Sequence, residues 1–75
     1  MTLIAPRISI DPSIRGGRPV IAGTRVPVAL LVGKVATGMT PTEVADEYGV
    51  AREDVLAALA YAAQLVADEE VRMAS

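Results

Sequence analysis

The sequence lacks cysteine, histidine, tryptophan and phenylalanine altogether, and its only aromatic residues are two tyrosines. Without cysteine the chain has no disulfide, no thiolate nucleophile and no zinc-finger ligand set. Without histidine it has no imidazole base to activate a serine or threonine and no histidine metal site. The acidic residues form no convincing metal-binding pattern. We therefore expect a protein that is not an enzyme and that binds no metal and no cofactor.

Leader and membrane signals are also missing. No basic region precedes the apolar residues at the start of the chain. The longest apolar run, from Val55 to Ala63, has nine residues, whereas a membrane helix needs about 20. A small secreted domain usually needs disulfides. We expect a cytoplasmic protein with no membrane partner.

The chain has a high content of apolar residues for a small domain. Its 75 residues are 52% hydrophobic, and most of these are alanine, valine, leucine and isoleucine. A domain of this size buries only about 60% of the surface of its unfolded chain. We expect a single domain, residues 1–75, that forms a homodimer or higher homo-oligomer. An alanine-rich helical monomer with ordinary surface alanines is the alternative.

Charge is divided along the chain. Residues 1–34 carry five basic residues and one acid, a net charge of +4, whereas residues 35–75 carry two basic residues and eight acids, a net charge of −6. Four of the five basic residues in the first part are arginines, which suit bidentate contacts with phosphate or carboxylate. This division indicates either that the two parts have different roles or that the basic part of one chain pairs with the acidic part of another in a dimer.

The first part of the chain predicts a small β segment, residues 8–27. Residues 8–10 alternate as in a short strand and end at an Asp-Pro turn pair. The runs 19–21 and 24–27 flank an Ala-Gly pair, which predicts a hairpin with a two-residue loop, and the prolines place it at a sheet edge. A hairpin is marginal alone. The sequence leaves open whether this hairpin pairs within one chain or between two.

Three helices are predicted in residues 28–70, followed by a flexible tail, residues 71–75. The first helix covers 28–37, where Gly33 costs about 1 kcal/mol relative to alanine and indicates close packing. Its inward face consists of Val28, Leu31 and Val35. The second helix covers 41–48, because Thr40-Pro41-Thr42-Glu43 is typical of a capping box and Gly49 ends the helix.

The third predicted helix runs from Ala51 to about Glu70 and is apolar nearly all round, which is typical of a helix buried on more than one side. We expect four of its residues to fill the core of the chain: Leu56, Leu59, Ala63 and Val66. A dimer interface is predicted to form from the hairpin and another face of this helix, with Val20, Ile21, Val26, Ala58, Tyr61, Ala62 and Leu65.

The second and third helices together indicate a helix-turn-helix. Ala45 supplies the small side chain that two crossing helices require, Gly49 allows the sharp turn, and Val55 points back into the core. The signal is weaker for DNA binding, because the third helix begins with Arg52 followed by two acids, and phosphates repel acids. A packing motif without DNA contact is the alternative. The candidate DNA-binding residues are Arg15, Arg18, Arg25 and Arg52.

The chain resembles family 433 of the domains of unknown function over about residues 8–63. The resemblance rests on Ile8-Ser9-Ile10-Asp11-Pro12, on Gly16-Gly17-Arg18-Pro19-Val20-Ile21-Ala22-Gly23-Thr24-Arg25-Val26-Pro27-Val28, on Gly38-Met39-Thr40-Pro41-Thr42-Glu43-Val44 and on Asp54-Val55-Leu56-Ala57-Ala58-Leu59-Ala60-Tyr61. It implies a mostly α fold, in which a short N-terminal β segment precedes a three-helix, homeodomain-like unit. Family members are bacterial and archaeal.

Many members of that family look like antitoxins of type II toxin–antitoxin pairs, whose toxin is a PIN-like ribonuclease encoded by the adjacent gene. The resemblance therefore implies an antitoxin that neutralises such a toxin, with repression of its own operon as a second expected role. The candidate toxin-binding residues lie between positions 66 and 75: Val66, Arg72 and Met73. Arg15, Arg18 and Arg25 compete with Arg72 for this role. A stand-alone DNA-binding regulator and an oligomerisation or adaptor module remain as alternatives.

Overall fold

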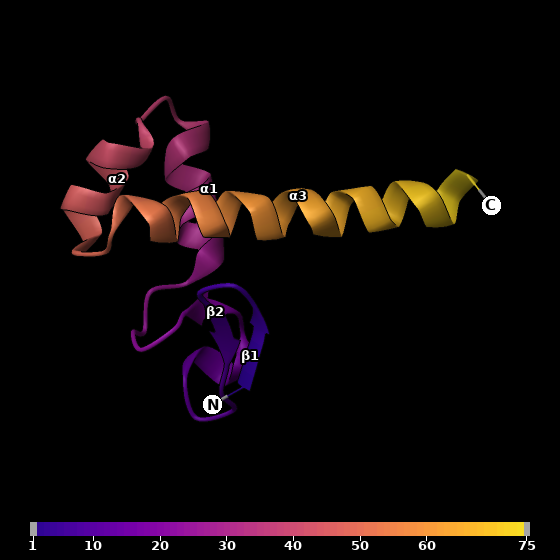
Figure 1. The fold of residues 1–75 in the computed structure, drawn as a ribbon, viewed down its shortest axis with the longest axis horizontal. Coiled ribbons are helices and arrows are strands. Elements are labelled where there is room, and N and C mark those ends of the chain that lie inside the picture. The colour runs from indigo at the N-terminus through magenta and orange to yellow at the C-terminus, as the bar shows by residue number, and fades with distance from the viewer. Residues whose placement is uncertain (1, 75) are drawn as a thin grey trace.

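The structure, a computed structural model, describes the backbone of residues 2–74 and the side chains of residues 2–69. A small antiparallel sheet comes first and three helices follow, as predicted (Figure 1). The elements are β1 (Thr2–Ala5), β2 (Ile8–Ile10), a short 3-10 turn (Arg15–Gly17), β3 (Val20–Ile21), α1 (Val28–Ala36), α2 (Pro41–Tyr48) and α3 (Arg52–Ala74).

The sheet has the order β1-β2-β3, and its central strand is the predicted strand β2. Ile8 pairs with Ile21 and Ser9 with Val20, so β3 pairs within the chain. The sequence analysis did not predict β1, whose side chains are mostly exposed. No buried face gives that segment an alternating pattern, so it forms a strand only because the edge of β2 is available to it.

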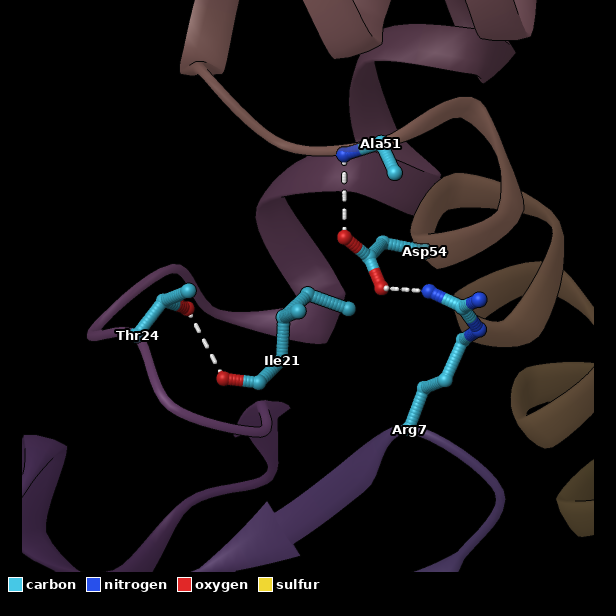
Figure 2. A network of polar contacts seen from close by, with 5 residues as sticks. All are labelled: Arg7, Ile21, Thr24, Ala51 and Asp54. Carbon is cyan, nitrogen blue, oxygen red and sulfur yellow. Dashed lines mark hydrogen bonds and ion pairs between the residues drawn. The ribbon is translucent and has the colours of Figure 1, made fainter.

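The predicted hairpin with a two-residue loop is wrong in its details. The second run forms no strand and gives only one isolated bridge, between Val20 and Pro27. The loop is wider than expected, and Thr24 closes it. The Thr24 hydroxyl donates to the Ile21 carbonyl oxygen at 2.8 Å (Figure 2). It also accepts from the Val26 N–H at 3.0 Å. The Thr24 hydroxyl thus bridges the Val26 N–H and the Ile21 carbonyl in place of a direct hydrogen bond. Two backbone hydrogen bonds still join the runs, from the Ile21 N–H to the Val26 carbonyl at 2.9 Å and from the Val28 N–H to the Pro19 carbonyl at 3.1 Å.

Helices α1 and α2 form largely as predicted. Val28 and Leu31 are buried in the core and Val35 packs against it. The capping box at the start of α2 is present, because the Glu43 N–H donates to the Thr40 hydroxyl at 3.2 Å and the Thr40 N–H donates to a Glu43 carboxylate oxygen at 2.9 Å. The prediction of close packing at Gly33 is wrong within the single chain, since a Cβ there would meet no atom of that chain within 4 Å.

The turn between α2 and α3 has the expected helix-turn-helix features. Gly49 has φ 68°, a left-handed conformation that closes α2, and its N–H donates to the Ala45 carbonyl. Ala45 is 4% exposed, and Val44 and Val55 are fully buried. The small side chain, the glycine and the inward valine thus have the packing roles that the sequence indicated.

The core-facing side of α3 differs from the prediction. Val55 and Ala58, three residues apart on one face, are fully buried against α1 and α2. The expected core residues lie elsewhere: Leu59 is only partly buried, Ala63 is exposed, Leu56 is 39% exposed and Val66 is 55% exposed. Periodicity could not select the inward face, because apolar residues occur all round this helix.

Beyond the core, α3 continues past every other element (Figure 1). It reaches Ala74, whereas the sequence predicted an end near Glu70 and a flexible tail at 71–75. Neither glycine nor proline follows Glu70, so nothing in the sequence ends the helix there. The radius of gyration is 12.7 Å, larger than the value of about 11 Å for a compact chain of this length.

Candidate interaction surface

The second half of α3 extends beyond the rest of the domain. We call residues 62–74 the arm (Figure 1). All side chains from Ala63 to Glu69 are exposed, among them Leu65 at 48% and Val66 at 55%. An isolated helix of this length is marginal in water, and most helices in proteins are stabilised by tertiary packing. The arm is therefore a natural place for a partner to bind.

A groove of about 680 Å³ lies where the arm begins. We call it the α1 groove. It runs between α1, the start of the arm and the loop that carries the basic residues, and most of its surface is apolar. Its lining residues are Arg15, Arg18, Pro19, Pro27, Val28, Ala29, Val32, Gly33, Tyr61, Ala62 and Leu65.

The predicted DNA-binding arginines do not form one site. Arg15 and Arg18 line the α1 groove, and the Arg15 Nε donates to the Arg25 carbonyl oxygen at 3.4 Å. All three side chains are exposed. Arg52 begins α3 and lines neither this groove nor the next one described. Arg15, Arg18 and Arg25 therefore form a basic surface beside an apolar groove, and we call the segment that carries them, residues 15–25, the basic loop.

A second groove, of about 430 Å³, lies between β1 and α3. We call it the β1 groove. Its lining residues are Ile4, Ala5, Pro6, Ala57, Ala60, Tyr61, Gln64, Leu65 and Asp68. The sequence does not predict this groove, because it does not predict β1. The available signal in the sequence was an apolar residue near the start of the chain, Ile4, which is 41% exposed in the structure.

The predicted dimer interface needs correction at three residues. Val20, Ile21 and Ala58 are at most 2% exposed within the single chain, so their side chains have no surface left for a partner. They were misplaced because core and interface residues have the same composition in a chain rich in alanine and valine. Tyr61, Ala62 and Leu65 line the α1 groove. Val26 is partly buried against the core.

The predicted toxin-binding residues lie along the arm. Val66 is 55% exposed and therefore accessible. Arg72 and Met73 lie on the backbone of α3, but their side chains are outside the described residues.

An ion pair that the sequence did not predict joins the sheet to the helix-turn-helix. The Arg7 guanidinium, from the turn between β1 and β2, lies 2.9 Å from Asp54 Oδ1 (Figure 2). The other carboxylate oxygen accepts from the Ala51 N–H at 2.9 Å and so caps α3. Asp54 is only 14% exposed. The pair fixes the turn against the start of α3, where a recognition helix would read DNA.

The surface of the helix-turn-helix is mainly acidic, although Arg52 at the start of α3 is exposed as well. Glu43, Asp46, Glu47 and Glu53 are all exposed on α2 and the first turn of α3. The Thr40 backbone N–H and hydroxyl hold the pKa of Glu43 below its usual value, so it stays charged. Phosphates are repelled from this acidic face of α2 and α3.

Outside this face, hydrogen bonds from Ser13 lower the pKa of Asp11, which follows β2.

The described part of the chain has neither a metal-ligand cluster nor a helix that could span a membrane. Among residues with described side chains, no three acidic, histidine or cysteine residues gather as metal ligands. No helix in the described residues has the length and apolar character to cross a membrane.

Comparisons with known proteins agree with the fold. Residues 8–62 match the family model described as protein of unknown function DUF433. A solved structure, of a DUF433 member protein from Anabaena variabilis, is 33% identical in sequence with a TM-score of 0.72. The alignment covers 92% of this chain and 69% of that one. No curated protein matches. The chain therefore belongs to the DUF433 family.

Proposed function

We propose that this protein is an antitoxin. It uses the arm to bind a ribonuclease toxin encoded by the adjacent gene. The observation that carries the proposal is the arm itself, which leaves the domain with Leu65 and Val66 about half exposed. A helix with apolar residues on its surface is a common binding element, because it lies in an apolar groove of a partner. A chain without histidine, cysteine or a metal cluster among its described residues suits a binding role.

The test is co-expression of the tagged chain with the adjacent open reading frame. We expect a stoichiometric complex and loss of ribonuclease activity as the chain is titrated into the toxin. Val66→Asp places a charge in the interface and should weaken the complex at least about tenfold, since burying a valine contributes about 1.5 kcal/mol or more. Ala67→Asp, at the next exposed position, is the matched control. Failure of the two proteins to associate would count against the proposal.

DNA binding is the second candidate, and the basic loop favours it. Arg15, Arg18 and Arg25 are all exposed, and a hydrogen bond joins Arg15 to the Arg25 carbonyl oxygen. The acidic surface of α2 opposes insertion of α3 into the major groove, so contacts with DNA would come from the loop. A salt-sensitive gel shift on the upstream region is the expected result. Unchanged affinity after Arg15, Arg18, Arg25 and Arg52 are all replaced by alanine would rule out this version.

A further inference from the structure

The α1 groove and the arm are complementary in apolar character and in charge. The groove is apolar along α1 and has Arg15 and Arg18 at its rim. The arm carries exposed Leu65 and, one turn later, the exposed acids Asp68 and Glu69. Within one chain the arm extends away from the sheet and the basic loop (Figure 1). Among the described residues, no ion pair joins these acids to Arg15 or Arg18 of the same chain, so the acids of a second chain can supply the partners.

We propose that the α1 groove binds the arm of a second copy of this chain, in a two-fold symmetric dimer with the two α3 helices antiparallel. Leu65 of each copy enters the other's groove beside Val32 and Gly33. The antiparallel direction then carries Asp68 and Glu69 toward Arg15 and Arg18. Symmetry gives two grooves and two arms, so every groove is filled. Val66 does not line the groove and stays exposed on the arm, where the toxin is proposed to bind.

Gly33 fits this arrangement. It is exposed in the middle of α1, and a Cβ there would meet no atom of its own chain within 4 Å. Its lack of a side chain has no packing explanation within the monomer. A neighbouring helix explains it, because small residues let two backbones approach closely. Ala29, one turn earlier, and Ala62 on the opposite wall are also small and also line the groove.

The surface area agrees with a covered arm. The chain exposes 4828 Å², whereas a compact protein of 7.8 kDa exposes about 4,400 Å². The excess, about 400 Å² per chain, is a large part of the roughly 600–1,000 Å² per partner that a standard interface buries. Contacts along the groove walls supply the rest.

The experiment is sedimentation velocity on the full chain alone, over a wide range of concentrations. We expect a dimer. Leu65→Glu should raise its dissociation constant at least about 100-fold, because both copies lose a buried leucine. Leu65 is half exposed in the single chain, and circular dichroism of the variant will show that it still folds.

A charge exchange tests the orientation. Arg18→Glu alone and Asp68→Arg alone each place like charges together twice in a homodimer and should each weaken it. An equimolar mixture should restore the dimer, because the mixed pair holds one native and one reversed ion pair. The Gln64 side chain donates to Asp68 at the surface, and this contact is not needed for folding. Arg52→Glu and Glu53→Arg, exposed residues outside the groove, are the matched controls and should change nothing.

Two results would overturn the proposal. One is a chain that stays monomeric at every concentration, which would leave the groove to a different protein. The other is a dimer that these variants do not weaken, or that mixing does not restore. Because the chain is tested alone, failure here is distinguishable from failure of toxin binding.

Discussion

Replacing Gly33 with alanine should stabilise the single chain. Gly33 lies in the interior of α1, where glycine is about 0.8–1.0 kcal/mol less favourable than alanine. Since a Cβ there meets nothing within 4 Å, no clash reduces the gain. We expect the free energy of unfolding to rise by about 1 kcal/mol and the melting temperature by about 4–8 °C.

Gly38 provides a matched control at the end of the same helix. A Cβ at Gly38 also meets nothing within 4 Å, but the residue has φ 106°, which disfavours any side chain. Gly38→Ala should therefore destabilise the chain by about 1–2 kcal/mol. The two substitutions add the same methyl group to the same kind of open space, so only the backbone conformation separates their signs.

The assay is urea unfolding followed by circular dichroism at low and high protein concentration. At low concentration Gly33→Ala should be more stable than the wild type. At high concentration the advantage should shrink, because the methyl group then lies in the occupied groove and weakens the dimer. A loss of stability at low concentration would refute the reasoning, since it would mean that Gly33 has a packing role within the chain.

Three further predictions concern local contacts. Asp54→Ala removes the partner of Arg7 and a cap of α3, and urea unfolding should show a loss of about 1 kcal/mol, whereas Glu53→Ala should change little. Ala58→Leu overpacks a fully buried site and should lower the melting temperature, at a cost of about 1–3 kcal/mol; an unchanged melting temperature would mean that Ala58 is not in the core. The lowered pKa of Glu43 contributes stability at neutral pH that is lost as the pH falls below about 4.3, the usual glutamate value. Urea unfolding at pH 7 and pH 3 should therefore show the wild type losing more stability than Glu43→Gln, and equal losses would contradict this.

The helices were predictable because their signals are local. Thr40, Pro41 and Glu43 define the start of α2 within four residues, and Gly49 ends it. The capping box and the left-handed turn depend on nearby backbone groups alone, so tertiary contacts were not needed to identify them. The same holds for Ala45 and Val55, whose burial follows from the geometry of two helices joined by a tight turn.

The sheet and the grooves were less predictable because they depend on distant residues. β1 has no alternating pattern and forms through pairing with β2. Arg7 and Asp54 are 47 positions apart, and nothing local links them. On α3, Ala58 could not be told from Leu56 and the other alanines around it, because the inward face is chosen by the direction in which α3 crosses α1.

The position of Tyr61 has a practical consequence. Tyr61 contributes to the walls of both grooves, and the chain has no tryptophan and only one other tyrosine, Tyr48. In a Tyr48→Phe variant, all intrinsic fluorescence would come from the place where the two grooves meet. Occupation of either groove would change the emission of that single ring, so the Tyr61 side chain of this variant would report on the chain's own association.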